Sequence, residues 1–167
     1  MYVTNGATGV TVGGSQNEGN VIGSTQDAGI RVNDLGTSVE VSFNTVGQNL
    51  AGDVRESGPP IFLNDGASDI LVDNNIVANA PFNGIRVRDV SNVTITNNEI
   101  VESSDGIEVD AGSSNIVIGT PGNGNIIYNT DLAGIRISDS DDIRIEENII
   151  GRDPHCLLYT SPSPRDS

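Results

Sequence analysis

The 167-residue sequence contains no tryptophan, no lysine, only three phenylalanines and a single cysteine. Every basic residue is an arginine, and acidic residues outnumber the arginines so far that the formal net charge is −15. Such a chain repels phosphate groups, which excludes nucleic acid and anionic lipid surfaces as partners. No apolar stretch reaches the ~18 residues that a membrane-spanning helix needs, so we expect no membrane insertion. One cysteine can form no internal disulfide.

Two short blocks recur along the chain, in a background rich in Gly, Asn, Asp, Ser and Thr that favours turns and strands. The first reads GIRVND from Gly29, GIRVRD from Gly84 and GIRISD from Gly134. The second reads VTITNNEI from Val93 and IRIEENII from Ile143. Repetition at this spacing is typical of a solenoid, in which no single repeat can bury a core alone. The repeats begin at Met1, Ile30, Ile61, Ile85, Ile107 and Ile135.

The strict alternation of apolar and polar residues within each block predicts short β-strands, with one set of side chains inward. Three strands per repeat, separated by tight bends, describe one coil of a parallel β-helix. We therefore predict an all-β parallel β-helix of about six coils and three short parallel sheets over residues 1–154. In the coil that begins at Ile85, the residues expected to point inward are Ile85, Val87, Val93, Ile95 and Ile100.

An asparagine recurs where the chain must bend between the second and third strands of a coil. We expect it to take the left-handed backbone that asparagine tolerates, and its stacked amides to form a hydrogen-bonded ladder along the axis. The role predicted for the column is thus architectural and not catalytic. Its members are Asn44, Asn75, Asn98 and Asn148, with Asn20 and Asn125 as equivalents.

These GIxV and VxIxNNxI blocks resemble those of right-handed parallel β-helix repeat proteins, which share the fold of pectate lyases and of many bacterial secreted and surface proteins. The resemblance covers Met1 to about Gly151 and rests on no catalytic motif. It implies a right-handed solenoid and an extracellular or cell-surface location, with the periplasm as an alternative. Fold alone does not decide function.

Residues 155–167 lack this alternation. The stretch from Cys156 to Asp166, CLLYTSPSPRD, resembles the translated product of a transposon-end sequencing adapter. We therefore expect 155–167 to be an artefactual or disordered tail, which leaves the remaining chain without a cysteine. Met1 aligns with Ile30, inside a first strand, and the last coil stops at Ile150. We accordingly expect an interior piece of a longer parent chain, uncapped at both ends.

The predicted outward face of the first sheet carries four arginines, although the chain as a whole is acidic. One column holds Tyr2, Arg31, Phe62, Arg86, Glu108 and Arg136, and the next holds Thr4, Asn33, Asn64, Arg88, Asp110 and Ser138. One interpretation is a ladder of ion pairs in which Glu108 lies between Arg86 and Arg136. The other is a carbohydrate-binding strip made of Arg31, Phe62, Arg86, Arg88, Glu108, Asp110 and Arg136.

Catalysis finds little support in the sequence. A pectate-type lyase needs clustered carboxylates around Ca²⁺, and only Glu108 and Asp110 lie together in this sheet. We therefore expect no cofactor, with Ca²⁺ as the alternative. The sequence predicts a non-catalytic segment of a secreted or cell-surface bacterial protein, a stalk or a polysaccharide-binding element. The alternative is a fragment of a polysaccharide lyase or glycoside hydrolase whose catalytic coils are missing.

Deleting Cys156–Ser167 tests the interpretation of the tail. Because this segment lacks the repeat and carries two prolines, we expect the thermal midpoint in a circular-dichroism melt to stay within error of the parent. A large drop would mean that the tail contributes to the fold.

Overall fold

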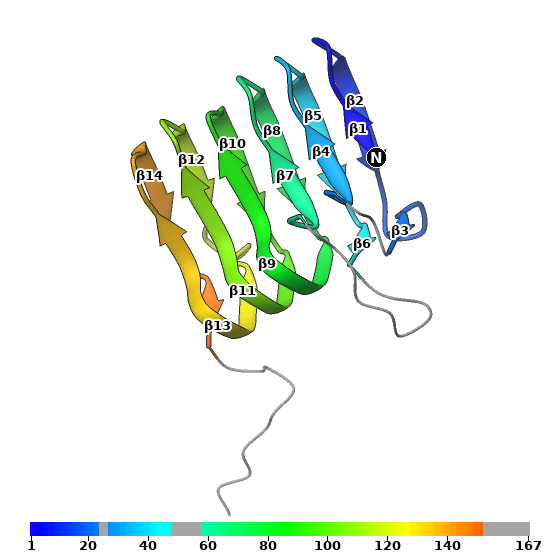
Figure 1. Cartoon of the computed structure of the whole chain (residues 1–167). Coiled ribbons are helices and arrows are strands. Elements are labelled where there is room, and N and C mark those ends of the chain that lie inside the picture. The colour runs from blue at the N-terminus through cyan, green and yellow to red at the C-terminus, as the bar shows by residue number, and fades with distance from the viewer. Residues whose placement is uncertain (24–26, 48–57, 152–167) are drawn as a thin grey trace, which may run out of the picture.

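The chain winds into a stack of parallel β-coils (Figure 1). The computed structural model describes residues 1–23, 27–47 and 58–151, and the predicted tail 155–167 lies outside them. Within this part of the chain all regular structure is β-strand, so it contains no helix that could cross a membrane. The all-β parallel solenoid predicted from the repeats is therefore confirmed.

Six strands of similar length form one sheet, whose order follows the order of the coils. Its pairings are all parallel and in register with the repeat, so that Val10, Val39, Ile70, Val93, Ile116 and Ile143 align. The strands are β2 (Thr8–Gly13), β5 (Thr37–Ser42), β8 (Ser68–Asp73), β10 (Ser91–Thr96), β12 (Ser114–Ile118) and β14 (Asp141–Ile145).

The other sheet joins the remaining two strand positions of each coil. Its short strands are β1 (Tyr2–Val3), β3 (Val21–Ile22), β4 (Ile30–Val32), β6 (Thr45–Val46), β7 (Ile61–Leu63) and β15 (Ile149–Ile150). Its long strands are β9 (Ile76–Arg88), β11 (Glu99–Asp110) and β13 (Ile126–Ile137). Each long strand runs through the third strand of one coil, around a bend, and into the first strand of the next.

Two details of the prediction were therefore wrong. The coils form two sheets and not three, because the parallel pairing of β9, β11 and β13 continues around the bend with only one shift of register. The stack also makes five complete turns, from Tyr2 round to Arg136, and only part of a sixth.

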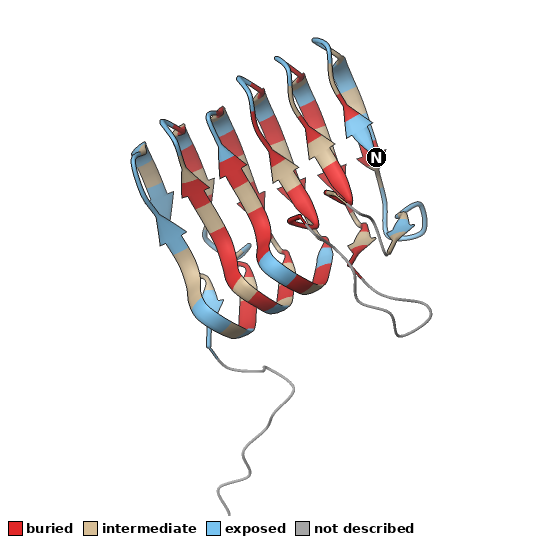
Figure 2. Cartoon of the chain, in the orientation of Figure 1, coloured by how far each residue is buried: buried red, intermediate tan, exposed pale blue. Residues whose placement is uncertain are grey.

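The core is a column of aliphatic side chains that fills the inside of the coils. Figure 2 colours the backbone of all buried residues red. The five inward residues predicted from alternation, Ile85, Val87, Val93, Ile95 and Ile100, are all at most 1% exposed. Exposure rises in the last described coil, where Ile145, Ile149 and Ile150 are 47–51% exposed. Burial in this fold thus comes from the coils above and below and not from the coil itself.

The glycine of the GIxV block is required by this stacking. A Cβ atom at Gly106 would lie 2.4 Å from the Cγ2 of Ile127 and 2.5 Å from the carbonyl oxygen of Gly134. A Cβ at Gly84 would lie 2.5 Å from Ile100. At these two positions the chain therefore enters the first strand with its backbone packed directly against the neighbouring coil, where a side chain does not fit.

The predicted asparagine ladder is present. The side-chain oxygen of Asn98 accepts hydrogen bonds from the backbone N–H and the Nδ2 of Asn75, at 3.0 and 2.9 Å. Asn98 in turn donates to the Oδ1 of Asn125, and its Nδ2 also reaches the carbonyl oxygens of Val72 and Thr96. The same pattern links Asn20, Asn44, Asn75, Asn98, Asn125 and Asn148.

The backbone reason given for these asparagines was wrong. At four of the six ladder positions the left-handed residue at the bend is the one before the asparagine, with φ of 57° at Phe43, 54° at Asn74, 53° at Asn97 and 53° at Glu147. That residue turns the chain, and the asparagine after it points inward, where its amide can satisfy carbonyl groups of its own coil and of the neighbouring coil.

Replacing Asn98 with Ala tests the ladder. The change leaves the Asn75 N–H buried without a partner and removes the amide hydrogen bonds to the carbonyls of Val72 and Thr96, so we expect a loss of about 2–5 kcal/mol in the free energy of unfolding, measured with urea. The exposed Asn123, whose side chain makes only contacts of 3.4 Å, provides the control, and Asn123→Ala should cost under about 0.5 kcal/mol. Equal losses in the two variants would remove the special role of the ladder.

Candidate functional site

The outward face of the first-strand positions carries the charged column that the repeats predict. Strand register aligns Tyr2 with Arg31, Arg31 with Phe62, and Phe62 with Arg86, and the column continues through Glu108 to Arg136. Neighbouring members are thus one strand spacing apart, about 4.8 Å. Register also places Arg88 beside Asp110 in the second column. We refer to Tyr2, Arg31, Phe62, Arg86, Arg88, Glu108, Asp110 and Arg136 as the arginine strip.

Arg86 lies at the centre of the strip and contacts two carboxylates of the next coil. Its Nη2 donates to the Oδ2 of Asp110 at 2.7 Å, and its Nε lies 3.2 Å from the Oε2 of Glu108. The Nε contact is an ion pair without hydrogen-bond geometry. The three side chains are 16–27% exposed. This partial burial and the double contact fix the position of the Arg86 guanidinium.

The predicted ladder required Arg136 to pair with Glu108, but the structure shows a different partner. The Nη2 of Arg136 donates instead to the Oδ1 of Asp105 at 3.0 Å, and the same oxygen accepts from the backbone N–H of Ala133. Asp105 is only 5% exposed. The hydrogen bond from Arg136 to Asp105, with the charge of Asp105, raises the pKa of the Arg136 guanidinium.

Arg31 is bound by a group that sequence reasoning did not identify. Its Nη1 contacts the Oδ2 of Asp27 at 3.0 Å, and the hydroxyl of Tyr2 donates to the same oxygen at 2.7 Å. The Arg31 guanidinium also lies 4.7 Å from the ring centroid of Phe62, and that of Arg86 lies 5.8 Å from it. Phe62 therefore joins the two arginines through cation–π contacts.

Asp27 and Asp105, the two partners that were missed, share a sequence signal. Each is an aspartate just ahead of a Gly-Ile pair, at Gly29-Ile30 and Gly106-Ile107. Because these positions precede the strand, the alternation pattern assigns them to no column. Only the three-dimensional path of the bend brings each of these aspartates into contact with an arginine.

Arg88 differs from the other three arginines of the strip. It is exposed, and no ion pair joins it to any residue that the structure describes. Beside it, the Oδ1 of Asp110 is buried and accepts no hydrogen bond. The guanidinium group of Arg88 is therefore open to a ligand. The charges of the other three arginines in the strip are already balanced by carboxylates.

Glu108 and Asp110 do not form the beginning of a calcium site. Both contact Arg86, and within residues 1–23, 27–47 and 58–151 no group of three or more Asp, Glu, His and Cys side chains is placed to hold a metal. Calcium needs six or more oxygen ligands, several of them carboxylates. The strip supplies ion pairs instead.

Replacing Tyr2 with Phe tests the contacts of Asp27. The pKa of the Asp27 carboxyl lies below its ordinary value of 3.8, chiefly because Tyr2 donates a hydrogen bond to it. Burial raises this pKa, and the charge of Arg31 lowers it. These contacts stabilise the ionised carboxylate of Asp27, so their contribution to the stability of the fold is lost as the pH falls through the lowered pKa. We expect the pKa of Asp27 to rise towards its ordinary value in Tyr2→Phe. An NMR titration of the Asp27 carboxyl group measures this change.

Asp69 serves as the control within the same spectra. Hydrogen bonds from Asn92 and Thr37 lower its pKa, and it lies in the other sheet. An unchanged pKa of Asp27 in the variant would show that the Tyr2 hydroxyl does not set it.

A comparison with known protein families agrees with this architecture. The family model described as "Right handed beta helix region" matches residues 53–163, more than half of the 167-residue chain. No curated protein and no solved structure matched. The matched region contains most of the strip, from Phe62 to Arg136. The chain belongs to the right-handed β-helix family.

Proposed function

We propose that this chain is a non-catalytic segment of a secreted or cell-surface bacterial protein, and that it binds an acidic polysaccharide along the arginine strip. The observation that carries the proposal is Arg88, an exposed arginine without an ion pair in the described part of the chain, beside the unpartnered Oδ1 of Asp110. A guanidinium in this position can bind a sugar carboxylate with two parallel hydrogen bonds.

The neighbouring groups favour a ligand that is extended along the rod. Phe62 and the guanidinium groups of Arg31 and Arg86 form a stack across three coils, and ion pairs hold both arginines. Side chains that are already held lose little conformational entropy on binding. The strip also alternates donors with the acceptors Glu108 and Asp110, which suits a polymer that carries both carboxylates and hydroxyls.

The charge balance limits the affinity that this face can reach. Asp27, Asp105, Glu108 and Asp110 neutralise three of the four arginines, and the chain as a whole carries −15. A single sugar residue would therefore bind weakly. Useful affinity requires several contacts along one polymer, as multivalent binding provides.

A catalytic role for Glu108 and Asp110 is supported less well. A lyase or hydrolase fragment remains the alternative proposal, and it would need carboxylates that are available to metal or substrate. Here one arginine contacts both. A purely structural stalk needs no exposed binding group, and Arg88 is the residue that distinguishes the glycan-binding proposal from it.

Arg88→Gln is the direct test. We expect it to weaken the binding of a uronate-containing oligosaccharide by roughly tenfold, because one charged bidentate contact is lost, and to leave the free energy of unfolding within about 0.5 kcal/mol. Calorimetric titration of parent and variant at two salt concentrations measures both the loss and its screening.

Arg144→Gln is the matched control, because Arg144 lies on β14 in the other sheet and its side chain is 59% exposed. It should leave binding unchanged. The proposal fails if the two variants lose affinity equally, or if the parent binds no member of a panel of uronate-containing glycans.

A further inference from the structure

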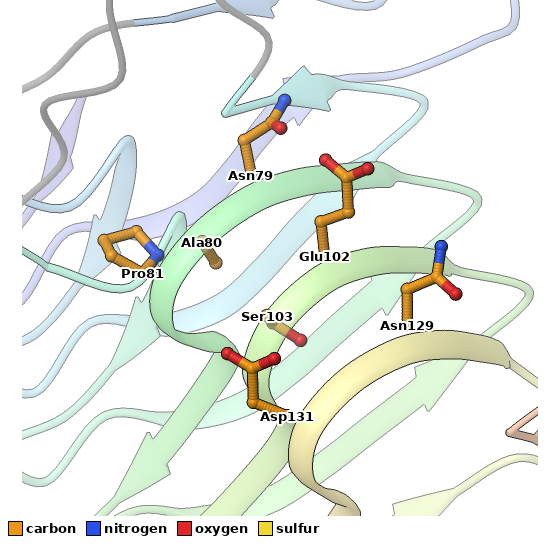
Figure 3. Close-up of a pocket in the computed structure, with 7 residues that line it drawn as sticks. All are labelled: Asn79, Ala80, Pro81, Glu102, Ser103, Asn129 and Asp131. Carbon is orange, nitrogen blue, oxygen red and sulfur yellow. The ribbon is translucent and has the colours of Figure 1, made fainter.

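A recess lies apart from the arginine strip, on the bend that joins the third strand of one coil to the first strand of the next. It is a pocket of about 470 Å³ formed by β9, β11 and β13 (Figure 3). Side chains from three successive coils line it: Asn79, Ala80, Pro81, Glu102, Ser103, Asn129 and Asp131. We call it the bend pocket.

At the bend pocket the bend of β11 is one residue shorter than the corresponding bends of β9 and β13. Ser103 pairs with Ala80 on one side and Thr130 on the other, and Asp105 then pairs with Asn83 and Ala133. Two residues separate these pairs in β9 and β13, but only Ser104 separates them in β11. The flanking strands β9 and β13 therefore each carry one extra residue here, a β-bulge, in the stretches that contain Pro81 and Asp131.

Ser103 lies at the floor of this recess and is only 3% exposed. Its hydroxyl oxygen has no hydrogen-bond partner. In Figure 3 the Ser103 side chain extends to the side on which Asp131 lies. A buried hydroxyl without a partner costs free energy that a bound ligand would recover.

The rim carries an alternating set of amides and carboxylates. Asn79, Glu102 and Asn129 stand at the same position of successive coils, and all have left-handed backbones, with φ of 54°, 57° and 54°. With Asp131 they give the recess two carboxylates, two amides and no basic side chain. The electrostatics therefore favour a ligand with a positive charge and several hydroxyls, and disfavour an anion.

Two further features favour a sugar over a bare cation. Within the described residues no third carboxylate, histidine or cysteine joins Glu102 and Asp131 in a metal-binding arrangement. Next to the lining residues, Phe82 and Leu132 are 53% and 68% exposed, and an exposed aromatic ring can pack against the apolar face of a pyranose. The volume also exceeds what one ion occupies.

We propose that the bend pocket binds a single amino-sugar residue, with Glu102 and Asp131 facing its ammonium group and Asn79, Asn129 and Ser103 bonding its hydroxyls. This site is independent of the arginine strip and has the opposite charge preference. A rod with both sites could contact a polymer that carries uronate and amino-sugar residues at two places.

Amide NMR titration of the full chain with glucosamine tests the proposal. A ligand of this size should bind with a Kd on the order of millimolar, with the largest shift changes at Asn79, Ser103 and Asn129. Glucose should bind more weakly and glucuronate least. Asp131→Asn should weaken glucosamine binding by roughly tenfold, because the ammonium group loses the opposite charge of its partner, and Ser103→Ala should weaken it by a smaller factor.

Asp141→Asn controls for net charge, because Asp141 is an exposed carboxylate on β14, and ethanolamine controls for the ammonium group alone. Neither the control variant nor the control ligand should reproduce the effect. The proposal is overturned if glucuronate binds as well as glucosamine, if ethanolamine causes the same shifts, or if Asp141→Asn loses as much affinity as Asp131→Asn. These outcomes leave the Arg88 test of the strip unaffected.

Discussion

The fold depends on hydrogen bonding between coils, and the asparagine ladder is where that bonding reaches the interior. Strand pairing satisfies backbone groups along the two sheets, but the chain must leave the sheet at the bend between the second and third strands of each coil. There Asn98 and its equivalents satisfy carbonyl groups of two coils and the N–H of a third residue. An inward aliphatic side chain would leave the N–H of Asn75 buried without a partner and would remove one hydrogen bond from each of the two carbonyls. The ladder thus allows a sharp bend beside an apolar core.

The same stacking explains which parts could be predicted from sequence. Alternation identifies inward and outward residues, and the repeat aligns them, so Ile85, Asn98 and the column from Tyr2 to Arg136 follow directly. The residues at the bends do not alternate between apolar and polar, so alternation predicts neither the arginine contacts of Asp27 and Asp105 nor the continuous strands β9, β11 and β13. The error at Asn98 is of this kind, because two adjacent asparagines, Asn97 and Asn98, divide the turning and the bonding between them.

The arginine strip shows how an acidic rod keeps cations on one face. In a parallel solenoid equivalent positions lie one strand spacing apart, so Arg31, Arg86 and Arg136, each two coils from the next, would repel one another unless acidic groups balanced them. Asp27, Asp105, Glu108 and Asp110 balance Arg31, Arg86 and Arg136. An ion-pair ladder and a binding face are therefore not exclusive interpretations: the paired arginines hold the surface rigid, and Arg88, which is left over, is the group that a ligand could use.

Coil length adds a second way to build a site on the same scaffold. A change of side chain alters one position of a column, whereas the loss of one residue from one bend moves the backbone and opens a recess between two bulges. The register of β11 against β9 and β13 records such a change between Ser103 and Asp105. Asp105, where this register shift ends, also pairs with Arg136. One short bend thus borders both surfaces, although the two sites bind independently and would recognise different charges.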